Sequence, residues 1–174
     1  YIDEKIKQIK DCKIEYIKID DSLFDICPIT PECQHISKQT YYRYLIPKLK
    51  PELEKCFYFD CDIVVKNSLN EFWNTDIEDN YIAAIEELWE EAHTYYENNG
   101  ISKSFNAGVI LINNQKWIKN NISKKLFENT KILVENQKIR WVDQDVLNYT
   151  LNGKVKFAEI LGRYFGQNLK GNFK

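Results

Sequence analysis

The feature that most restricts the fold of this chain is the apolar run at residues 56–65, CFYFDCDIVV, which two aspartates interrupt. Its aromatic and β-branched residues are typical of a strand, and a nearly continuous apolar run is typical of a strand buried on both faces. A buried carboxylate without a partner is costly, and two of them repel each other, so a positive group should lie beside Asp60 and Asp62. The run therefore predicts a central strand that leads into a charged site.

The rest of the chain alternates strand-like runs with amphipathic segments, which indicates an α/β fold with a mostly parallel sheet between helices. Without a linker or a repeat, residues 1–174 are expected to form a single domain. Pro47 is expected to end or bend the first full helix, and Asp143 and Gly153 to cap and stop the last one. The expected strands are residues 14–19, 81–85, 109–112 and 155–158, the expected helices are residues 37–46, 114–135 and 143–151, and residues 1–10 resemble the end of a charged helix.

Charge and composition exclude some classes of protein. The formal net charge of −2 argues against a nucleic-acid binder, which usually carries a basic face. No apolar run approaches the roughly 20 residues that span a bilayer, and no signal-peptide pattern is visible at the start. The five cysteines follow no framework spacing, which favours a reducing compartment. A local basic patch leaves contact with an anionic membrane open, at Lys116, Lys119, Lys124 and Lys125.

Asp60 and Asp62 form an Asp-x-Asp (DxD) pattern that suits a divalent cation. Mg²⁺ and Mn²⁺ prefer carboxylate oxygens and bridge to phosphates. A plainer interpretation is that the strand ends at Phe59 and both aspartates are solvated turn residues. The text FDCDIV also satisfies the signature of haloacid-dehalogenase-like phosphatases, in which the first aspartate is a phosphorylated nucleophile.

Two later segments gather polar groups beside buried elements. Residues 105–108, FNAG, place an amide and two small residues directly before an apolar run, where backbone can approach a ligand closely. Residues 143–145, DQD, open the expected short helix. Each has a purely structural reading, as a tight turn and as an N-cap with favourable acidic charge. The phosphatase class has no use for either segment.

Four segments in order resemble glycosyltransferase family eight: YYRYLIP from Tyr41, CFYFDCDIVV from Cys56, SFNAGVILIN from Ser104 and WVDQDVLN from Trp141. This family contains retaining galactosyl- and glucosyltransferases of the lipopolysaccharide and glycogenin types. The resemblance implies a type A nucleotide-diphosphosugar transferase fold with a Rossmann-like sheet. It also implies Mn²⁺ or Mg²⁺, hexosyl transfer from UDP-galactose or UDP-glucose to a glycan or glycolipid acceptor, and cytoplasmic residence, including the inner membrane face.

The resemblance assigns donor-binding roles by position. Asp60 and Asp62 would hold the metal that bridges the donor diphosphate, with Asp60 also against the donor. Arg43 would contact the donor sugar or phosphate. Asn106 and Ala107 would line the donor sugar.

The expected catalytic residues are Asp143, Gln144 and Glu86. By resemblance Asp143 would hydrogen-bond sugar hydroxyls, Gln144 would lie close to the anomeric carbon, and Glu86 would lie near the transferred sugar. An amide is a poor nucleophile, so we expect same-face transfer in which a phosphate oxygen of UDP helps to deprotonate the acceptor. This differs from a retaining hydrolase, in which a carboxylate acts as the nucleophile.

Both ends of the chain depart from the family pattern. By resemblance, the first strand, which contacts uracil and ribose, would precede Tyr1, and the His and Lys motif that completes the metal site would follow near Lys174. The alternative function is therefore a truncated or non-catalytic domain that binds a nucleotide sugar without turnover.

Overall fold

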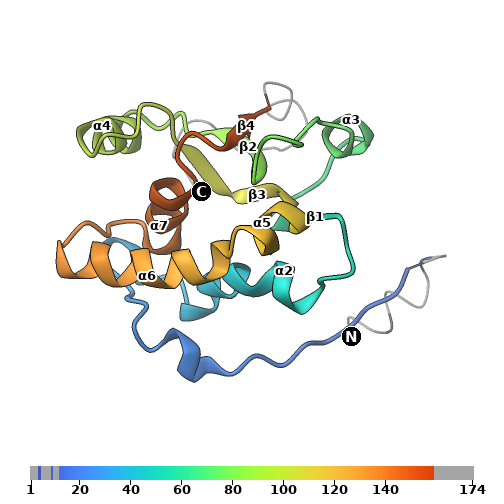
Figure 1. Cartoon of the computed structure of the whole chain (residues 1–174), viewed down its shortest axis with the longest axis horizontal. Coiled ribbons are helices and arrows are strands. Elements are labelled where there is room, and N and C mark those ends of the chain that lie inside the picture. The colour runs from blue at the N-terminus through green and yellow to red at the C-terminus, as the bar shows by residue number, and fades with distance from the viewer. Residues whose placement is uncertain (1–3, 5–8, 10–11, 159–174) are drawn as a thin grey trace.

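The computed structural model describes residue 4, residue 9 and residues 12–158 (Figure 1). The charged helix expected at residues 1–10 lies almost wholly outside the described residues. The elements are the 3-10 helices η1 (Asp21–Phe24), η2 (Pro31–Cys33) and η3 (Lys38–Leu45), the helices α2 (Ile46–Leu49), α3 (Asn70–Trp73), α4 (Glu90–Asn98), α5 (Asn114–Lys119), α6 (Ile122–Glu135) and α7 (Val142–Leu151), and the strands β1 (Lys55–Phe59), β2 (Ile82–Glu86), β3 (Phe105–Asn113) and β4 (Val155–Phe157).

The described strands form one mixed sheet in the order β1-β3-β2-β4. Strand β3 runs antiparallel to both β1 and β2, and among the described strands only β2 and β4 pair in parallel. The α/β class is confirmed, but the mostly parallel sheet is wrong for the described residues. Nearly continuous apolar runs are typical of strands that are covered on both faces, and β3 is covered in this way although it is antiparallel to both neighbours.

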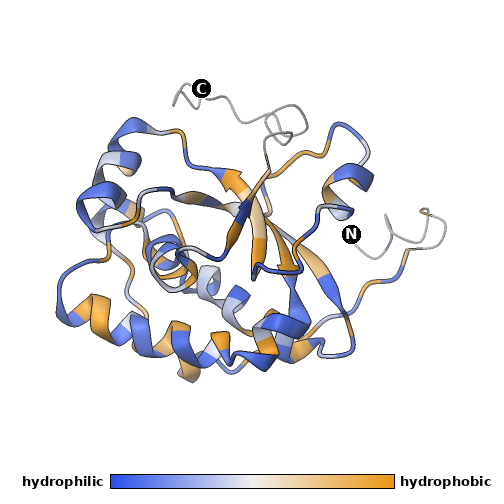
Figure 2. Cartoon of the chain, turned by 45° about the horizontal axis from the view of Figure 1, so that its top comes forward, coloured by the Kyte–Doolittle hydropathy of each residue, from blue (hydrophilic) through white to orange (hydrophobic). Residues whose placement is uncertain are grey.

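Strand β3 is apolar on both faces because each face packs against a separate core. Ile110 and Ile112 face the larger core, which η3, α5, α6 and α7 complete. Val109 and Leu111 face the opposite side and pack with Phe72 of α3. Figure 1 shows α2, α5, α6 and α7 on one side of the sheet, and Figure 2 shows largely apolar colouring along the strands.

Two expected strands are corrected. Residues 14–19 form an extended segment that pairs with no strand in the described part of the chain, although Ile19 packs against the core. Strand β1 stops at Phe59 instead of continuing to residue 65, and its residues are half-buried. Residues 61 and 62 form a turn, and Val64 beyond them is exposed. The backbone N–H of Asp60 still donates to the carbonyl of Gly108, at 2.8 Å, so the chain leaves the sheet just after this residue.

The helices also differ from the expected ones in detail. The segment at residues 114–135 is two helices, because Asn121 adopts a left-handed conformation with φ 54°. Pro47 does not end the first helix: it lies in the first turn of α2, where its missing N–H is not needed, and the 3-10 helix η3 precedes it. Helix α7 begins at Val142, so Asp143 lies inside its first turn and does not cap it. No helix within residues 12–158 is long and apolar enough to cross a membrane.

Truncating the core face of α6 should destabilise the chain strongly. Leu126 is fully buried, so Leu126→Ala should lower the free energy of unfolding by about 2–5 kcal/mol. Ile132 lies on the same helix with 45% of its surface exposed, and Ile132→Ala should change it by less than about 1 kcal/mol. Urea denaturation of both variants tests this, and equal losses would contradict the described packing of α6.

Candidate functional site

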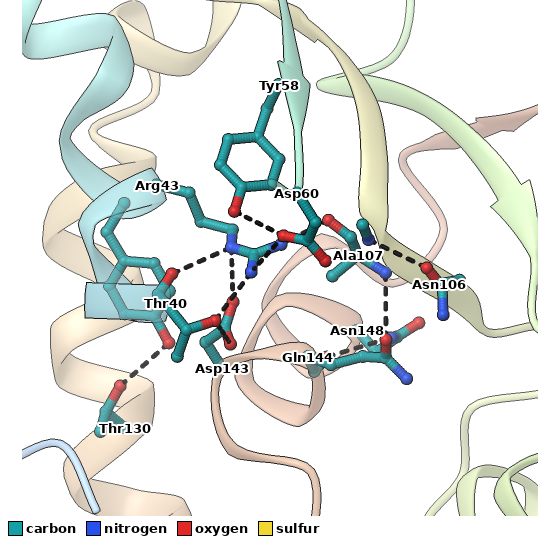
Figure 3. A network of polar contacts seen from close by, with 12 residues as sticks. Thr40, Arg43, Tyr58, Asp60, Asn106, Ala107, Thr130, Asp143, Gln144 and Asn148 are labelled. Atoms are coloured by element: carbon teal, nitrogen blue, oxygen red, sulfur yellow. Dashed lines mark hydrogen bonds and ion pairs between the residues drawn. The ribbon is translucent and has the colours of Figure 1, made fainter. Parts of the chain in front are cut away.

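The guanidinium of Arg43 lies at the centre of the polar network in Figure 3. The side chain is 5% exposed, and its Nε lies 2.8 Å from Oδ2 of Asp143. Its Nη2 lies 3.2 Å from Oδ1 of Asp60, and its Nη1 donates to the carbonyl of Ala107. The guanidinium carbon stands 4.3 Å from the ring centroid of Tyr58. A residue of η3 therefore joins the end of β1, the start of β3 and the first turn of α7.

Asp60 is the point at which this network reaches the surface. Tyr58, two residues earlier on β1, donates its hydroxyl to Oδ1 at 2.6 Å. Its other oxygen, Oδ2, faces Gly108, where an added Cβ would stand only 2.8 Å away. A side chain at residue 108 would therefore force the Asp60 carboxylate to move. Arg43 supplies a positive group beside Asp60 but makes no described contact with Asp62, so the divalent cation expected for the aspartate pair stays a prediction.

Asp62 is exposed in the turn that follows β1. The described residues contain no group of three or more histidine, cysteine, aspartate or glutamate side chains arranged to hold a metal. Asp60 offers Oδ2 outside its contacts with Arg43 and Tyr58, and Asp62 offers a solvated carboxylate. These hard oxygen donors fit Mg²⁺ or Mn²⁺, which commonly take one or two carboxylates together with phosphate oxygens.

The FNAG segment begins β3 and presents its backbone to α7. Asn106 accepts a hydrogen bond on Oδ1 from the N–H of Gly108 at 2.9 Å. The N–H of Ala107 donates to Oε1 of Gln144 at 3.0 Å (Figure 3). The carbonyl of Ala107 is the acceptor for Arg43. The N–H and the carbonyl of Ala107 are thus both hydrogen-bonded to side chains from distant parts of the chain.

Asp143 is 2% exposed, and its environment is unusual for a carboxylate. Thr40 donates its hydroxyl to Oδ1 at 2.6 Å, and Arg43 pairs with Oδ2. Burial raises the pKa of Asp143 to about 6, although the charge of Arg43 and the Thr40 hydrogen bond act in the opposite direction. A pKa shift of this kind is common at functional sites, where burial and a specific charged partner act together.

Asn148 and Asp145 hold helix α7 in place, and the sequence motifs that contain them gave neither residue a role. The amide of Asn148 accepts from the N–H of Phe105 at 2.8 Å and donates to its carbonyl at 2.9 Å. Asp145 accepts from the N–H groups of Arg140 and Trp141, each at 2.6 Å, and from the hydroxyl of Tyr96 at 2.6 Å. Its side chain thus satisfies the N–H groups of the two residues that precede α7.

Glu86 does not join this network. Its carboxylate pairs with Lys103 at 2.9 Å. The neighbouring Glu87 instead lies beside Asn106 and Gln144. The register of β2 shifts between Ala84 and Ile85, directly before the two glutamates. The residue pattern alone could not show this shift.

The other expected site residues, apart from Asp62, fall into one neighbourhood. Arg43 contacts Asp60, Ala107 and Asp143 directly. Gln144 contacts Ala107, and Asn106 reaches Glu87. Asp62 follows Asp60 after one residue but lies outside these contacts. Such a site combines carboxylates that can hold a cation with amides and a buried acid that can hydrogen-bond hydroxyl groups.

The family of the chain follows from comparison with known proteins. A family model described as Glycosyl transferase family 8 matches residues 2–166. This chain belongs to that family, as its four motifs indicated.

The relatives agree on this assignment. The chain is 35% identical over 136 residues to the lipopolysaccharide 1,3-galactosyltransferase of Salmonella typhimurium, covering 74% of this chain and 40% of that protein. It is 31% identical over 130 residues to the lipopolysaccharide 1,2-glucosyltransferase of Escherichia coli, covering 72% of this chain and 38% of that protein. The crystal structure of the galactosyltransferase LgtC with donor and acceptor sugar analogs matches with a TM-score of 0.75 at 30% identity, over 84% of this chain and 52% of that one. The chain therefore spans about half of these relatives or less.

Replacing the positively charged side chain of Arg43 should show how much the buried carboxylate of Asp143 costs in stability. Arg43→Met leaves Asp143 without its positive partner and should lower the free energy of unfolding by about 3–5 kcal/mol. Adding Asp143→Asn should recover part of this loss, with a coupling energy on the order of 1–3 kcal/mol. Urea denaturation of the two single variants and the double variant gives the coupling, and Lys48→Met, at an exposed residue nearby, is the control. Strictly additive losses would contradict the pairing.

The raised pKa of Asp143 also predicts a pH dependence of stability. The pKa of Asp143 is about 6 in the folded chain against an ordinary value of 3.8, so folding favours the protonated form. Below about pH 4 the group is protonated in both states and costs no stability. As the pH rises from about 4 to above 6, the free energy of unfolding should fall, and by pH 7 the loss should be about 3 kcal/mol. Asp143→Asn removes this titration. The variant should gain about that much relative to the parent chain between pH 4 and pH 7 in urea denaturation, and parallel curves would contradict the raised pKa.

Proposed function

We propose that this chain forms the donor-binding part of a retaining hexosyltransferase that uses UDP-galactose or UDP-glucose and a divalent cation. The observation that carries the proposal is the convergence of Asp60, Ala107 and Asp143 on Arg43 in a member of glycosyl transferase family 8. The acceptor we propose is a glycan or glycolipid of the lipopolysaccharide type, since two relatives carry that substrate in their names. The type A nucleotide-diphosphosugar fold and peripheral contact with a membrane belong to the same proposal.

The proposed cation ligands are Asp60 and Asp62. A divalent cation bound there, Mn²⁺ or Mg²⁺, would neutralise negative charge that develops on the departing UDP. Tyr58 and Arg43 support this role, because both hold Oδ1 of Asp60 and so fix the direction of its carboxylate. Gly108 leaves room for Oδ2.

The proposed sugar site lies between β3 and α7. Asn106 and Ala107 would line the sugar, and Asp143 would hydrogen-bond its hydroxyls. A direct donor contact by Arg43 stays a prediction. In the described contacts Arg43 orients Asp60 and Asp143, and we propose that this is its main contribution.

Gln144 is the residue that we propose beside the anomeric carbon. Its Oε1 accepts a hydrogen bond from Ala107 and so has a defined direction. A carbonyl oxygen there can stabilise positive charge on the sugar ring without forming a bond. We therefore propose same-face transfer, in which the bond between sugar and UDP breaks as the acceptor oxygen attacks, and a phosphate oxygen of UDP takes the acceptor proton. A covalent sugar adduct on Gln144, Asp143 or Glu86 would overturn this step.

The proposal is tested by titrating UDP into the protein by calorimetry. We expect binding with Mn²⁺ and much weaker binding with a chelator. Asp62→Asn should weaken the metal-dependent binding about tenfold or more, because each carboxylate ligand adds to cation affinity. Asp79→Asn is the matched control, since Asp79 is 99% exposed and pairs only loosely with Lys116 at 3.8 Å.

The outcomes separate the competing functions. Absence of UDP binding would contradict the nucleotide-sugar function, and binding that needs neither metal nor Asp62 would contradict the cation site. Binding without turnover of UDP-galactose or UDP-glucose would indicate the non-catalytic alternative. The phosphatase alternative predicts a phosphorylated Asp60 instead, and no observation on the site favours it.

A further inference from the structure

The carboxylate of Glu87 contacts both amide side chains of the site, and no sequence motif pointed to it. Its Oε2 lies 3.4 Å from Nδ2 of Asn106 and 3.4 Å from Nε2 of Gln144. At this length the contacts are long hydrogen bonds, so each is weak by itself. Asn106 belongs to β3 and Gln144 to α7, and one carboxylate therefore links the two elements that flank the proposed sugar site.

Glu87 is itself held in place. Its backbone N–H donates to the carbonyl of Ser104 at 2.9 Å, which ties it to the residue before β3. Its second oxygen, Oε1, accepts from the N–H of Trp89 at 3.1 Å, at the entry to α4. Oε1 of Glu87 thus stabilises the turn that leads into α4, and Oε2 faces the amides of Asn106 and Gln144.

The contacts set the orientation of both amides. An ionised carboxylate can only accept hydrogen bonds, so it selects the NH₂ end of each amide. The carbonyl ends then meet backbone N–H groups, with Oε1 of Gln144 at 3.0 Å from Ala107 N and Oδ1 of Asn106 at 2.9 Å from Gly108 N. The two ends of an amide have nearly the same shape, so packing alone would not distinguish them. The carboxylate of Glu87 and the backbone N–H groups distinguish them together.

We propose that Glu87 is a positioning residue for sugar transfer, which orients the amide of Gln144 and increases the electron density on its Oε1. This inference rests on the proposed function. Hydrogen bonds in a chain polarise one another, and Glu87, Gln144 and Ala107 form such a chain. A more negative carbonyl oxygen stabilises positive charge on the sugar better in the transition state than in the ground state, and this raises turnover more than binding.

The kinetic test compares Glu87→Gln with Glu97→Gln. The first keeps the shape but loses the charge, and the second removes an exposed α4 carboxylate whose described partner is His93. Hydrolysis of the UDP-hexose, with water as acceptor, measures turnover without a known acceptor. Glu87→Gln should lower kcat about tenfold to a hundredfold, with UDP affinity unchanged. Glu97→Gln should match the parent protein.

An NMR measurement separates positioning from a general loss of structure. The side-chain amide signal of Gln144, identified by its absence in Gln144→Glu, should shift in Glu87→Gln and stay in place in Glu97→Gln. Glu87→Asp keeps the charge and should recover part of kcat. An unchanged kcat in Glu87→Gln, or a lower kcat with an unmoved amide signal, would overturn the inference. Failure of the parent protein to bind UDP would overturn the proposed function instead, and the amide signal would still test the orienting contact.

Discussion

A single buried guanidinium holds four segments of this chain together. Arg43 enters from η3 and meets Asp60 after β1, Ala107 in β3 and Asp143 in α7. Burying a cation is costly unless its donors are satisfied, and the planar fork of arginine can satisfy several acceptors at once. The dependence is mutual, because Asp143 is 2% exposed and could not remain charged without a cation beside it. The arrangement of the site therefore follows from the requirement that these charges be buried together.

A second layer of contacts aligns α7 with β3. Asn148 closes two hydrogen bonds with the backbone of Phe105, and Asp145 satisfies the N–H groups of the two residues that precede the helix. These contacts leave Gln144 facing the backbone of Ala107. Because both elements are also packed in the main core, side chains on them are held more precisely than loop residues would be. Gly108 adds a steric condition, since a side chain there would displace Asp60.

The charges around the site have a consequence for the proposed donor. Asp60, Asp62, Asp143 and Glu87 are acidic, whereas Arg43 is the only cation that contacts any of them in the described structure. A diphosphate approaching such a surface would be repelled unless a divalent cation came with it. The charges of the site are therefore consistent with the cation in the proposed function.

The sequence by itself determined the family, the buried run of β3, and most of the residues that lie together around Arg43, because apolar runs and short motifs are local properties. It also led to the expectation of a positive group beside Asp60, from the cost of a buried carboxylate. Only the tertiary structure decided that this group includes Arg43, that β3 runs antiparallel to its neighbours, and that Glu87 and not Glu86 contacts the amides. Thr40 and Asp143 are 103 residues apart in the chain, and Arg43 and Ala107 are 64 apart. The pattern of a segment records how deeply it is buried, whereas strand direction, a register shift between Ala84 and Ile85, and the partner of a charge depend on what packs against it.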